Sequence, residues 1–205
     1  GFGVLFSDFD NDGWPDIYVA NDSQPNLLFH NKRDGTFSEV GLLSGSALNE
    51  AGRAQSGMGV AAGDYDGNGY LDIFVTNFAR DTNTLYKNLG NMFFIDTTVA
   101  AGLGEISLPY LGWGTNLADF DNDGLLDIFA ANGHVYPQVD ALKVGQTYLQ
   151  RKEVYRNLGN GKFEEVARSS PDLLTEKSSR GSAVADYDND GDLDVLVVDD
   201  GSSDH

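Results

Sequence analysis

The 205-residue chain has no cysteine, only two methionines and few basic side chains. Without cysteine it can form neither disulfides nor thiolate metal sites. Thirteen Lys and Arg against 32 Asp and Glu give a formal net charge of −19, which makes nucleic acid and anionic membranes poor partners. No apolar run approaches the ~20 residues that cross a bilayer, and no signal peptide is recognisable. We therefore expect no nucleic-acid partner and no membrane insertion.

Aspartate and glycine are abundant instead, and they recur together in four acidic motifs of nine residues. The motifs occupy residues 8–16, 64–72, 119–127 and 186–194, so they repeat after 56, 55 and 67 residues. Each has Asp or Asn at motif positions 1, 3, 5 and 9 and glycine at position 6. A further glycine stands five residues before each motif. Fifteen of the 25 aspartates occupy positions 1, 3, 5 and 9, so these motifs account for most of the acidity.

A loop that turns alternate side chains inward gathers several carboxylates around one point, and glycine permits the sharp turn. Two carboxylates about 4 Å apart repel by roughly 4 kcal/mol at an effective dielectric near 20, so each loop needs a cation. Oxygen-only ligands favour a hard ion over zinc or copper, and flexible coordination favours Ca²⁺ over Mg²⁺. We expect four Ca²⁺ sites, with these side-chain ligands: Asp8, Asp10, Asp12, Asp16, Asp64, Asp66, Asn68, Asp72, Asp119, Asp121, Asp123, Asp127, Asp186, Asp188, Asp190 and Asp194. The second site should be the weakest because Asn68 carries no charge.

An EF-hand shares the first half of this pattern but requires a bidentate glutamate at position 12 and flanking helices. Position 12 is apolar in all four motifs and lies in an apolar run: Val19, Val75, Ala130 and Val197. The EF-hand interpretation therefore fails in every copy.

Short apolar segments flank each motif and predict β-strands. First strands are expected at residues 4–7, 60–63, 115–118 and 182–185, and second strands at 17–20, 73–76, 128–131 and 195–198. The second strands show no alternation, which indicates burial on both faces. Hairpins rich in Asn and Gly close the first three units, and Met92 replaces the glycine of the other two turns, which predicts a different turn geometry. Four strands in about 56 residues are typical of a propeller blade.

We therefore predict an all-β fold in which residues 1–205 form one partial β-propeller. The expected blades are 1–56, 57–111, 112–178 and a half blade at 179–205. Blade 3 contains an insertion at residues 134–152, which either carries a binding function or covers an edge. The aromatic residue at position 2 of each motif should pack between neighbouring blades. His30 shares the strand position of Lys87 and Arg156, a slot that we expect to be exposed and without a metal role.

With these motifs the chain resembles the FG-GAP/VCBS repeat family, whose best-known members are the integrin α-subunit heads. Gly1-Phe2-Gly3, the four acidic loops and the hairpin at 157–163 carry the resemblance. Residues 95–103 and 132–137 resemble more closely the extracellular ASPIC-domain proteins related to cartilage acidic protein. The resemblance implies a seven-bladed propeller, with the remaining blades supplied by the same polypeptide or by another subunit. It also implies that the position-7 carbonyls join the Ca²⁺ ligands: Trp14, Tyr70, Leu125 and Asp192.

The resemblance and the acidic loops together predict a calcium-binding recognition or adhesion module that works outside the cytoplasm, as an extracellular, cell-surface or periplasmic protein with a protein or glycan ligand. A carbohydrate-binding lectin is an alternative, although Trp14 and Trp113 do not occupy equivalent positions in their units. A propeller enzyme such as a polysaccharide lyase or hydrolase is a third possibility. It would need His, Arg, Tyr and Glu at the propeller centre, and the sequence shows no Ser-His-Asp arrangement or phosphate-binding glycine loop. We therefore expect no enzymatic activity.

Overall fold

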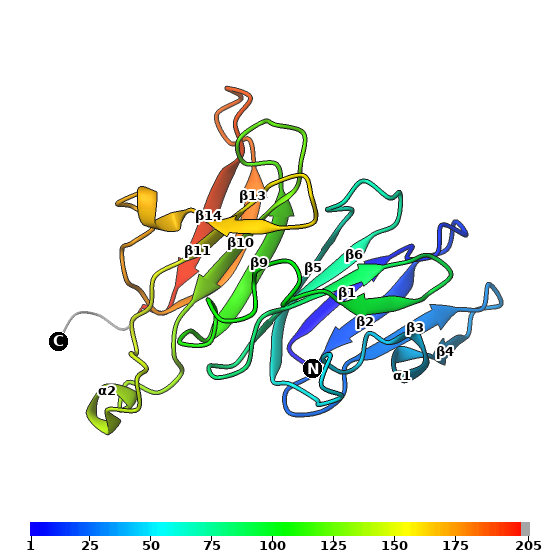
Figure 1. The fold of residues 1–205 in the computed structure, drawn as a ribbon, viewed down its shortest axis with the longest axis horizontal. Coiled ribbons are helices and arrows are strands. Elements are labelled where there is room, and N and C mark those ends of the chain that lie inside the picture. Colours follow the sequence, from blue (N-terminus) through cyan, green and yellow to red (C-terminus); the bar gives the residue numbers. More distant parts are fainter. Residues whose placement is uncertain (202–205) are drawn as a thin grey trace.

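The computed structural model describes residues 1–201 and is built almost entirely from β-strands (Figure 1). Three four-stranded antiparallel sheets and one two-stranded sheet follow one another along the chain. Within each sheet the strand order follows the sequence, so every sheet is a meander of hairpins. The predicted all-β blades are confirmed. Residues 202–205, at the end of the expected half blade 179–205, lie outside the described residues.

The strands and short helical turns have the following bounds. The first sheet contains β1 (Gly3–Ser7), β2 (Asp16–Ala20), β3 (Leu27–Asn31) and β4 (Phe37–Glu39). The second contains β5 (Gly57–Gly63), β6 (Asp72–Asn77), β7 (Thr84–Asn88) and β8 (Phe94–Asp96), and the third contains β9 (Gly112–Ala118), β10 (Asp127–Asn132), β11 (Glu153–Asn157) and β12 (Phe163–Glu165). The fourth contains β13 (Ser179–Ala185) and β14 (Asp194–Asp199). The helical turns are α1 (Gly41–Ser44), α2 (Val139–Leu142) and η1 (Ala167–Ser169), and none of the described helices is long and apolar enough to cross a membrane.

Three first strands begin earlier than expected, at Gly57, Gly112 and Ser179 rather than at residues 60, 115 and 182. Each of these strands pairs with its neighbour through a register shift near its start. Such a bulge lets a strand continue past an unpaired residue, and strict hydrophobic patterns do not reveal it.

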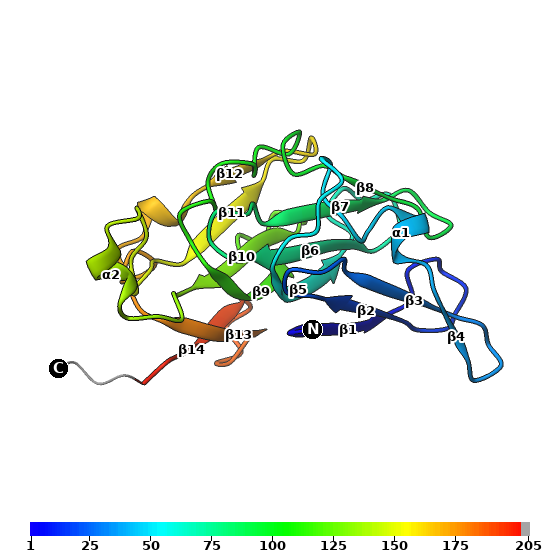
Figure 2. The same cartoon turned by 90° about the horizontal axis from the view of Figure 1, so that it is seen from below.

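The first strands of successive sheets lie side by side, β1 against β5, β5 against β9 and β9 against β13 (Figures 1 and 2). The sheets therefore radiate from a shared inner edge as the blades of a propeller. The backbones approach so closely there that a Cβ on Gly59 would lie 1.9 Å from the carbonyl oxygen of Trp113. A Cβ on Gly3 or Gly114 would meet backbone atoms of the next blade at 2.7 and 2.4 Å. This approach explains the glycine five residues before each of the first three motifs.

Aromatic side chains at position 2 of the first two motifs fill the space between blades, as predicted, but the prediction is wrong for Tyr187 of the fourth motif, which is exposed. Phe9 packs edge-to-face against Phe94 of the second blade, and Tyr65 packs against Phe163 of the third. The second strands β6 and β10 are buried along their whole length. The prediction that second strands are buried on both faces is wrong for β2, in which buried and half-buried residues alternate, and for β14, which is largely exposed because no further sheet covers it within residues 1–201.

The predicted difference in the second hairpin turn is also confirmed. The first turn has positive φ at Arg33 and Gly35, and the third at Gly159 and Gly161. The second turn has three residues with positive φ, Gly90, Asn91 and Met92. Met92 therefore has the left-handed conformation of the glycine that it replaces, and Asn91 adds a third left-handed residue to this turn.

Candidate metal centres

Each acidic motif forms the loop between the first and second strand of its blade, held by backbone hydrogen bonds to its own carboxylates. The position-1 carboxylate accepts the N–H groups of positions 5 and 6 at 2.8–3.1 Å in all four loops. The glycine at position 6 has φ between 88° and 96°, a conformation that side-chain-bearing residues rarely adopt. The position-9 carboxylate accepts the N–H of position 2 at 2.9–3.1 Å. These bonds draw both ends of the loop together.

The loops bring the carboxylates of positions 1, 3 and 9 close together in every copy. One oxygen from each lies within 4.8 Å of the others in the clusters Asp8/Asp10/Asp16, Asp64/Asp66/Asp72, Asp119/Asp121/Asp127 and Asp186/Asp188/Asp194. These four clusters could each hold a metal ion. The position-5 side chain is turned toward the loop backbone, where its Oδ1 accepts the position-7 N–H at 2.8–2.9 Å: Asp12, Asn68, Asp123 and Asp190. Ligation by position 5 and by the four position-7 carbonyls stays a prediction.

Burial raises the pKa of the position-9 carboxylate in the first three loops. Desolvation raises the pKa of Asp72 to about 7, against the opposing effect of the N–H groups of Asn88 and Tyr65. Nearby Asp66 adds to the rise because like charges disfavour ionisation. Burial also raises the pKa of Asp16 and Asp127. A divalent cation at each cluster would favour the ionised form and remove this repulsion.

An asparagine at the end of the third strand connects the loop of its own blade to the preceding blade in the second and third blades. Asn88 donates its backbone N–H to Asp72 at 2.7 Å and its side-chain amide to the carbonyl of Phe9 in the first loop at 2.8 Å. Asn157 bonds in the same way to Asp127 and to the carbonyl of Tyr65. One side chain therefore holds a metal loop to its own sheet and to the preceding blade.

Three segments of the chain match the family described as FG-GAP-like repeat: residues 8–75, 64–130 and 143–197. The chain belongs to the FG-GAP repeat family. All four acidic loops fall within these matches. Residues 131–142, which lie between the second and third FG-GAP matches, fall mostly in the insertion of the third blade.

Curated relatives extend the similarity over nearly the whole chain. Cartilage acidic protein 1 from Homo sapiens is 31% identical over 200 residues, and the proteins of the same name from Xenopus tropicalis and Mus musculus are 30% and 31% identical over 204 residues. Each match covers 96% of this chain, which spans 28–29% of the length of these relatives. A solved Agrocybe aegerita lectin, described as recognising non-reducing terminal N-acetylglucosamine, aligns with a TM-score of 0.49 and 20% identity over 95% of this chain and 46% of that one. A similarity this weak carries no inference about a ligand.

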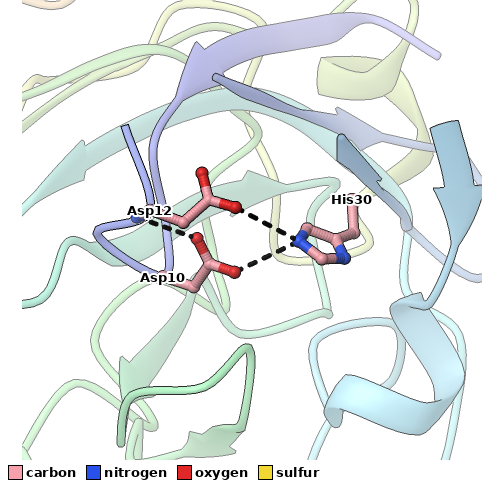
Figure 3. Close-up of side chains that lie close together, drawn as sticks. All are labelled: Asp10, Asp12 and His30. Atoms are coloured by element: carbon pink, nitrogen blue, oxygen red, sulfur yellow. Dashed lines mark hydrogen bonds and ion pairs between the residues drawn. The ribbon is translucent and has the colours of Figure 1, made fainter. Parts of the chain in front are cut away.

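The first FG-GAP loop has a histidine beside it that the strand pattern did not reveal (Figure 3). His30 lies on β3, and its Nε2 is 3.1 Å from Asp10 Oδ2 and 3.8 Å from Asp12 Oδ2. The sequence predicts that His30 is exposed and has no metal role. The prediction of exposure is wrong, because His30 is half-buried and turned toward the loop. The hydrogen bond from the N–H of Asn31, the next residue, to Asp16 fixes this approach, and the strand pattern of the sequence does not show it.

The insertion of the third blade forms a pocket with the turn that follows β6. The pocket has a volume of about 460 Å³ and lies between residues 78–80 and the insertion. His134 contacts the rings of Phe78 and Tyr136, at centroid distances of 5.5 and 5.8 Å. Burial lowers the pKa of His134, and its Nδ1 accepts the N–H of Tyr136. Because strands alternate in direction, this pocket lies at the opposite end of the blades from the FG-GAP loops.

A second cluster of ionisable groups is buried inside the third blade. Glu153 is fully buried, and its carboxylate accepts bonds from the Tyr155 hydroxyl at 2.8 Å and the Asn132 amide at 3.1 Å. Desolvation raises the pKa of Glu153 to about 7. The residue types resemble those that a propeller enzyme would need, but the Glu153 carboxylate is enclosed by the sheet rather than open to a substrate.

Proposed function

We propose that this FG-GAP chain is a calcium-stabilised extracellular recognition module without enzymatic activity. The observation that carries the proposal is the repetition of one three-carboxylate cluster at the same place in four successive units. A cluster of this kind repels itself unless a cation is present, and its hard oxygen ligands suit Ca²⁺. The asparagine bonds between loops and blades support a structural role for the bound ion, since they link the first and second loops to the blade that follows each of them.

The affinity expected for such sites supports a location outside the cytoplasm. Extracellular calcium modules bind with a Kd of about 10⁻⁴–10⁻³ M. With a Kd of about 0.1 mM and about 1 mM free Ca²⁺, each site stabilises the fold by roughly 1.4 kcal/mol, and four sites by roughly 6 kcal/mol. This sum is comparable to the whole stability of a typical domain, and nearly all of it vanishes at submicromolar Ca²⁺.

A melting experiment with and without calcium tests the structural role of the ion. The Tm of the chain should be highest in 1 mM Ca²⁺ and should fall sharply in EDTA. Replacing EDTA by EGTA in the presence of Mg²⁺ should leave most of that fall in place, because Mg²⁺ demands a strict octahedral geometry that these loops do not impose. A melting curve that does not respond to either chelator would contradict the proposal.

We assign recognition to the pocket between residues 78–80 and the insertion. Its lining is mainly apolar, including Phe78, Val139, Leu142 and Val144, with Arg80 at its edge. Such a lining suits an inserted protein side chain better than a polar sugar. Because the calcium loops lie at the other end of the blades, the ion would stabilise the recognition surface without contacting the ligand.

A binding screen against extracellular proteins and a glycan array, each run in Ca²⁺ and in EDTA, tests the recognition role. The Tyr136→Ala variant should lose binding while melting like the parent, because the Tyr136 side chain is 62% exposed. The exposed Leu89→Ala variant, in a hairpin turn of the second blade, serves as the control and should bind normally. Binding only to glycans would favour the lectin alternative, and binding that survives in Tyr136→Ala would place recognition elsewhere.

A further inference from the structure

The first loop differs from the other three because an imidazole nitrogen completes a cluster with its acidic side chains. One ligand atom each from Asp10, Asp12 and His30 lies within 4.8 Å of the others. The two aspartates belong to the loop between β1 and β2, whereas His30 comes from β3 (Figure 3). The hydrogen bond from the Asn31 backbone N–H to Asp16, at 2.9 Å, fixes this part of β3 against the loop. The backbone therefore places the histidine at the cluster.

Within the described part of the chain, the Nε2 atom of His30 lies within ion-pair distance of Asp10 and Asp12 but has no hydrogen-bond partner. It is buried from solvent and makes no hydrogen bond of acceptable geometry, although Asp10 Oδ2 is only 3.1 Å away. Buried polar atoms nearly always have a partner, and each exception needs an explanation. A metal ion between Nε2 and the two carboxylate oxygens would give the nitrogen a partner.

The donor set indicates the class of ion. Two carboxylate oxygens and one imidazole nitrogen form a borderline set that suits Zn²⁺ and its first-row neighbours, whereas Ca²⁺ takes oxygen ligands. The two carboxylates balance the charge of a divalent ion, and water can complete a tetrahedral shell. We propose that the first loop and His30 bind one divalent transition-metal ion through Asp10 Oδ2, Asp12 Oδ2 and His30 Nε2.

Within the described residues, the equivalent positions of the other complete blades cannot form the same site. Lys87, which replaces His30 in the second blade, forms an ion pair with Asp66. Arg156, which replaces it in the third, is paired with Glu164 at 3.0 Å and has no lone pair to offer. One site of this type is therefore expected, and it shares Asp10 and Asp12 with the Ca²⁺ site predicted for the first loop.

Arg33 occupies part of the space in which the ion would bind. Its Nε and Nη2 atoms donate to Asp12 Oδ2 at 2.9 and 2.6 Å. The side chain of Arg33 is 55% exposed, so it can swing into solvent when an ion takes its place. Replacing Arg33 should therefore tighten metal binding, whereas replacing a residue that binds the ion should weaken it.

Titration of Zn²⁺ into calcium-free protein, followed by the ring nitrogen signals of histidine, tests the proposal directly. The sequence has only three histidines, so the His30 signals can be assigned with the His30→Gln variant. One equivalent of Zn²⁺ should shift the His30 Nε2 signal while the signals of the buried His134 stay in place. An unshifted His30 signal at one equivalent would overturn the proposal. This readout needs no calcium and is independent of the proposed recognition function.

Calorimetry on three variants separates ligation from general attraction to an acidic surface. His30→Gln should weaken the tight Zn²⁺ site by at least about tenfold, because it removes a ligand. Lys87→Gln, the matched change in the second blade, should leave that site unchanged, and Arg33→Gln should strengthen it. Equal affinity in His30→Gln and the parent, or equal losses in His30→Gln and Lys87→Gln, would show that the acidic loops alone attract the ion.

Discussion

Asn68 sets the second loop apart at the scale of single residues. It is the only uncharged side chain at position 5, and its amide donates to the carbonyl of Asn88 at 3.0 Å. The missing charge should make the second Ca²⁺ site the weakest, as the sequence predicts. The hydrogen bond of the Asn68 amide anchors the loop to the end of β7, and this contact does not need a metal ion.

The Asn68→Asp variant should therefore have opposite effects with and without calcium. An added negative charge should tighten the second site by roughly tenfold, since opposite charges attract by several kcal/mol at close range and part of this is lost to desolvation. In EDTA the variant should be less stable by about 1–2 kcal/mol, because a carboxylate facing the Asn88 carbonyl cannot donate. Calorimetry on single-loop variants and urea unfolding in EDTA measure the two effects. If the second site of the parent is the tightest of the four, charge does not set the order.

Glu153 makes the stability of the chain depend on pH. Burial raises its pKa from 4.5 to about 7, so the folded state binds a proton that the unfolded state releases. The free energy of unfolding should therefore fall as pH rises from about 4.5 to about 7 and stay constant above that. The Tyr155 hydroxyl and the Asn132 amide, which donate to the carboxylate, oppose this rise in pKa but do not cancel it.

The Glu153→Gln variant should remove this dependence. Near pH 5 it should match the parent, and at pH 8 it should be more stable by up to about 3 kcal/mol, the equivalent of the rise in pKa. Glu164→Gln, on the exposed side of β12, is the control and should change neither value. Urea unfolding at the two pH values in saturating Ca²⁺ measures the difference. A variant that is less stable than the parent at pH 8 would show that Glu153 is ionised and favourably paired.

At the scale of elements, the inner strands require glycine where one blade meets the next. A Cβ on Gly59 would lie 1.9 Å from the carbonyl oxygen of Trp113, which also accepts the Thr76 hydroxyl at 2.6 Å. Gly59→Ala should therefore destabilise the chain by at least about 3 kcal/mol, since β5 and β9 would have to separate. Gly181→Ala, at the same position of β13, meets only Val198 at 3.9 Å and should be nearly neutral. Urea unfolding of both variants in Ca²⁺ tests the pair, and equal losses would contradict the role of blade packing.

The sequence predicts the blades and the acidic loops well because both depend on local patterns. Repeated spacing, turn residues and apolar runs are visible within a few residues of each other, and they locate the carboxylates of positions 1, 3 and 9. Long-range features are different. The glycine before each motif is apparent in the sequence, but its cause is the backbone of the next blade. The approach of His30 to Asp10 likewise depends on the pairing of β2 with β3, which a strand pattern does not resolve at the level of one side chain.

At the scale of the whole molecule, the described residues leave apolar side chains uncovered on both outer faces. Phe2, Val4 and Phe6 are 57–63% exposed at the side of β1. On the opposite face Tyr187 is 88% exposed and Leu196 is 69% exposed, although the equivalent Phe9 and Tyr65 are buried between blades. Natural propellers close such faces against further blades. The seven-bladed ring implied by the family resemblance remains a prediction.

We expect the purified 205-residue chain to self-associate through these faces. Its outermost strand β14 also has an open edge within the described residues, and exposed apolar edges favour pairing with other chains. Sedimentation velocity in Ca²⁺ should show oligomers or aggregates whose proportion rises with protein concentration. Leu196→Glu, which places a charge on the β14 face, should reduce association, whereas Leu43→Glu on the exposed turn α1 should not. A stable, compact monomer at all concentrations would show that this module needs no further blades to stay in solution.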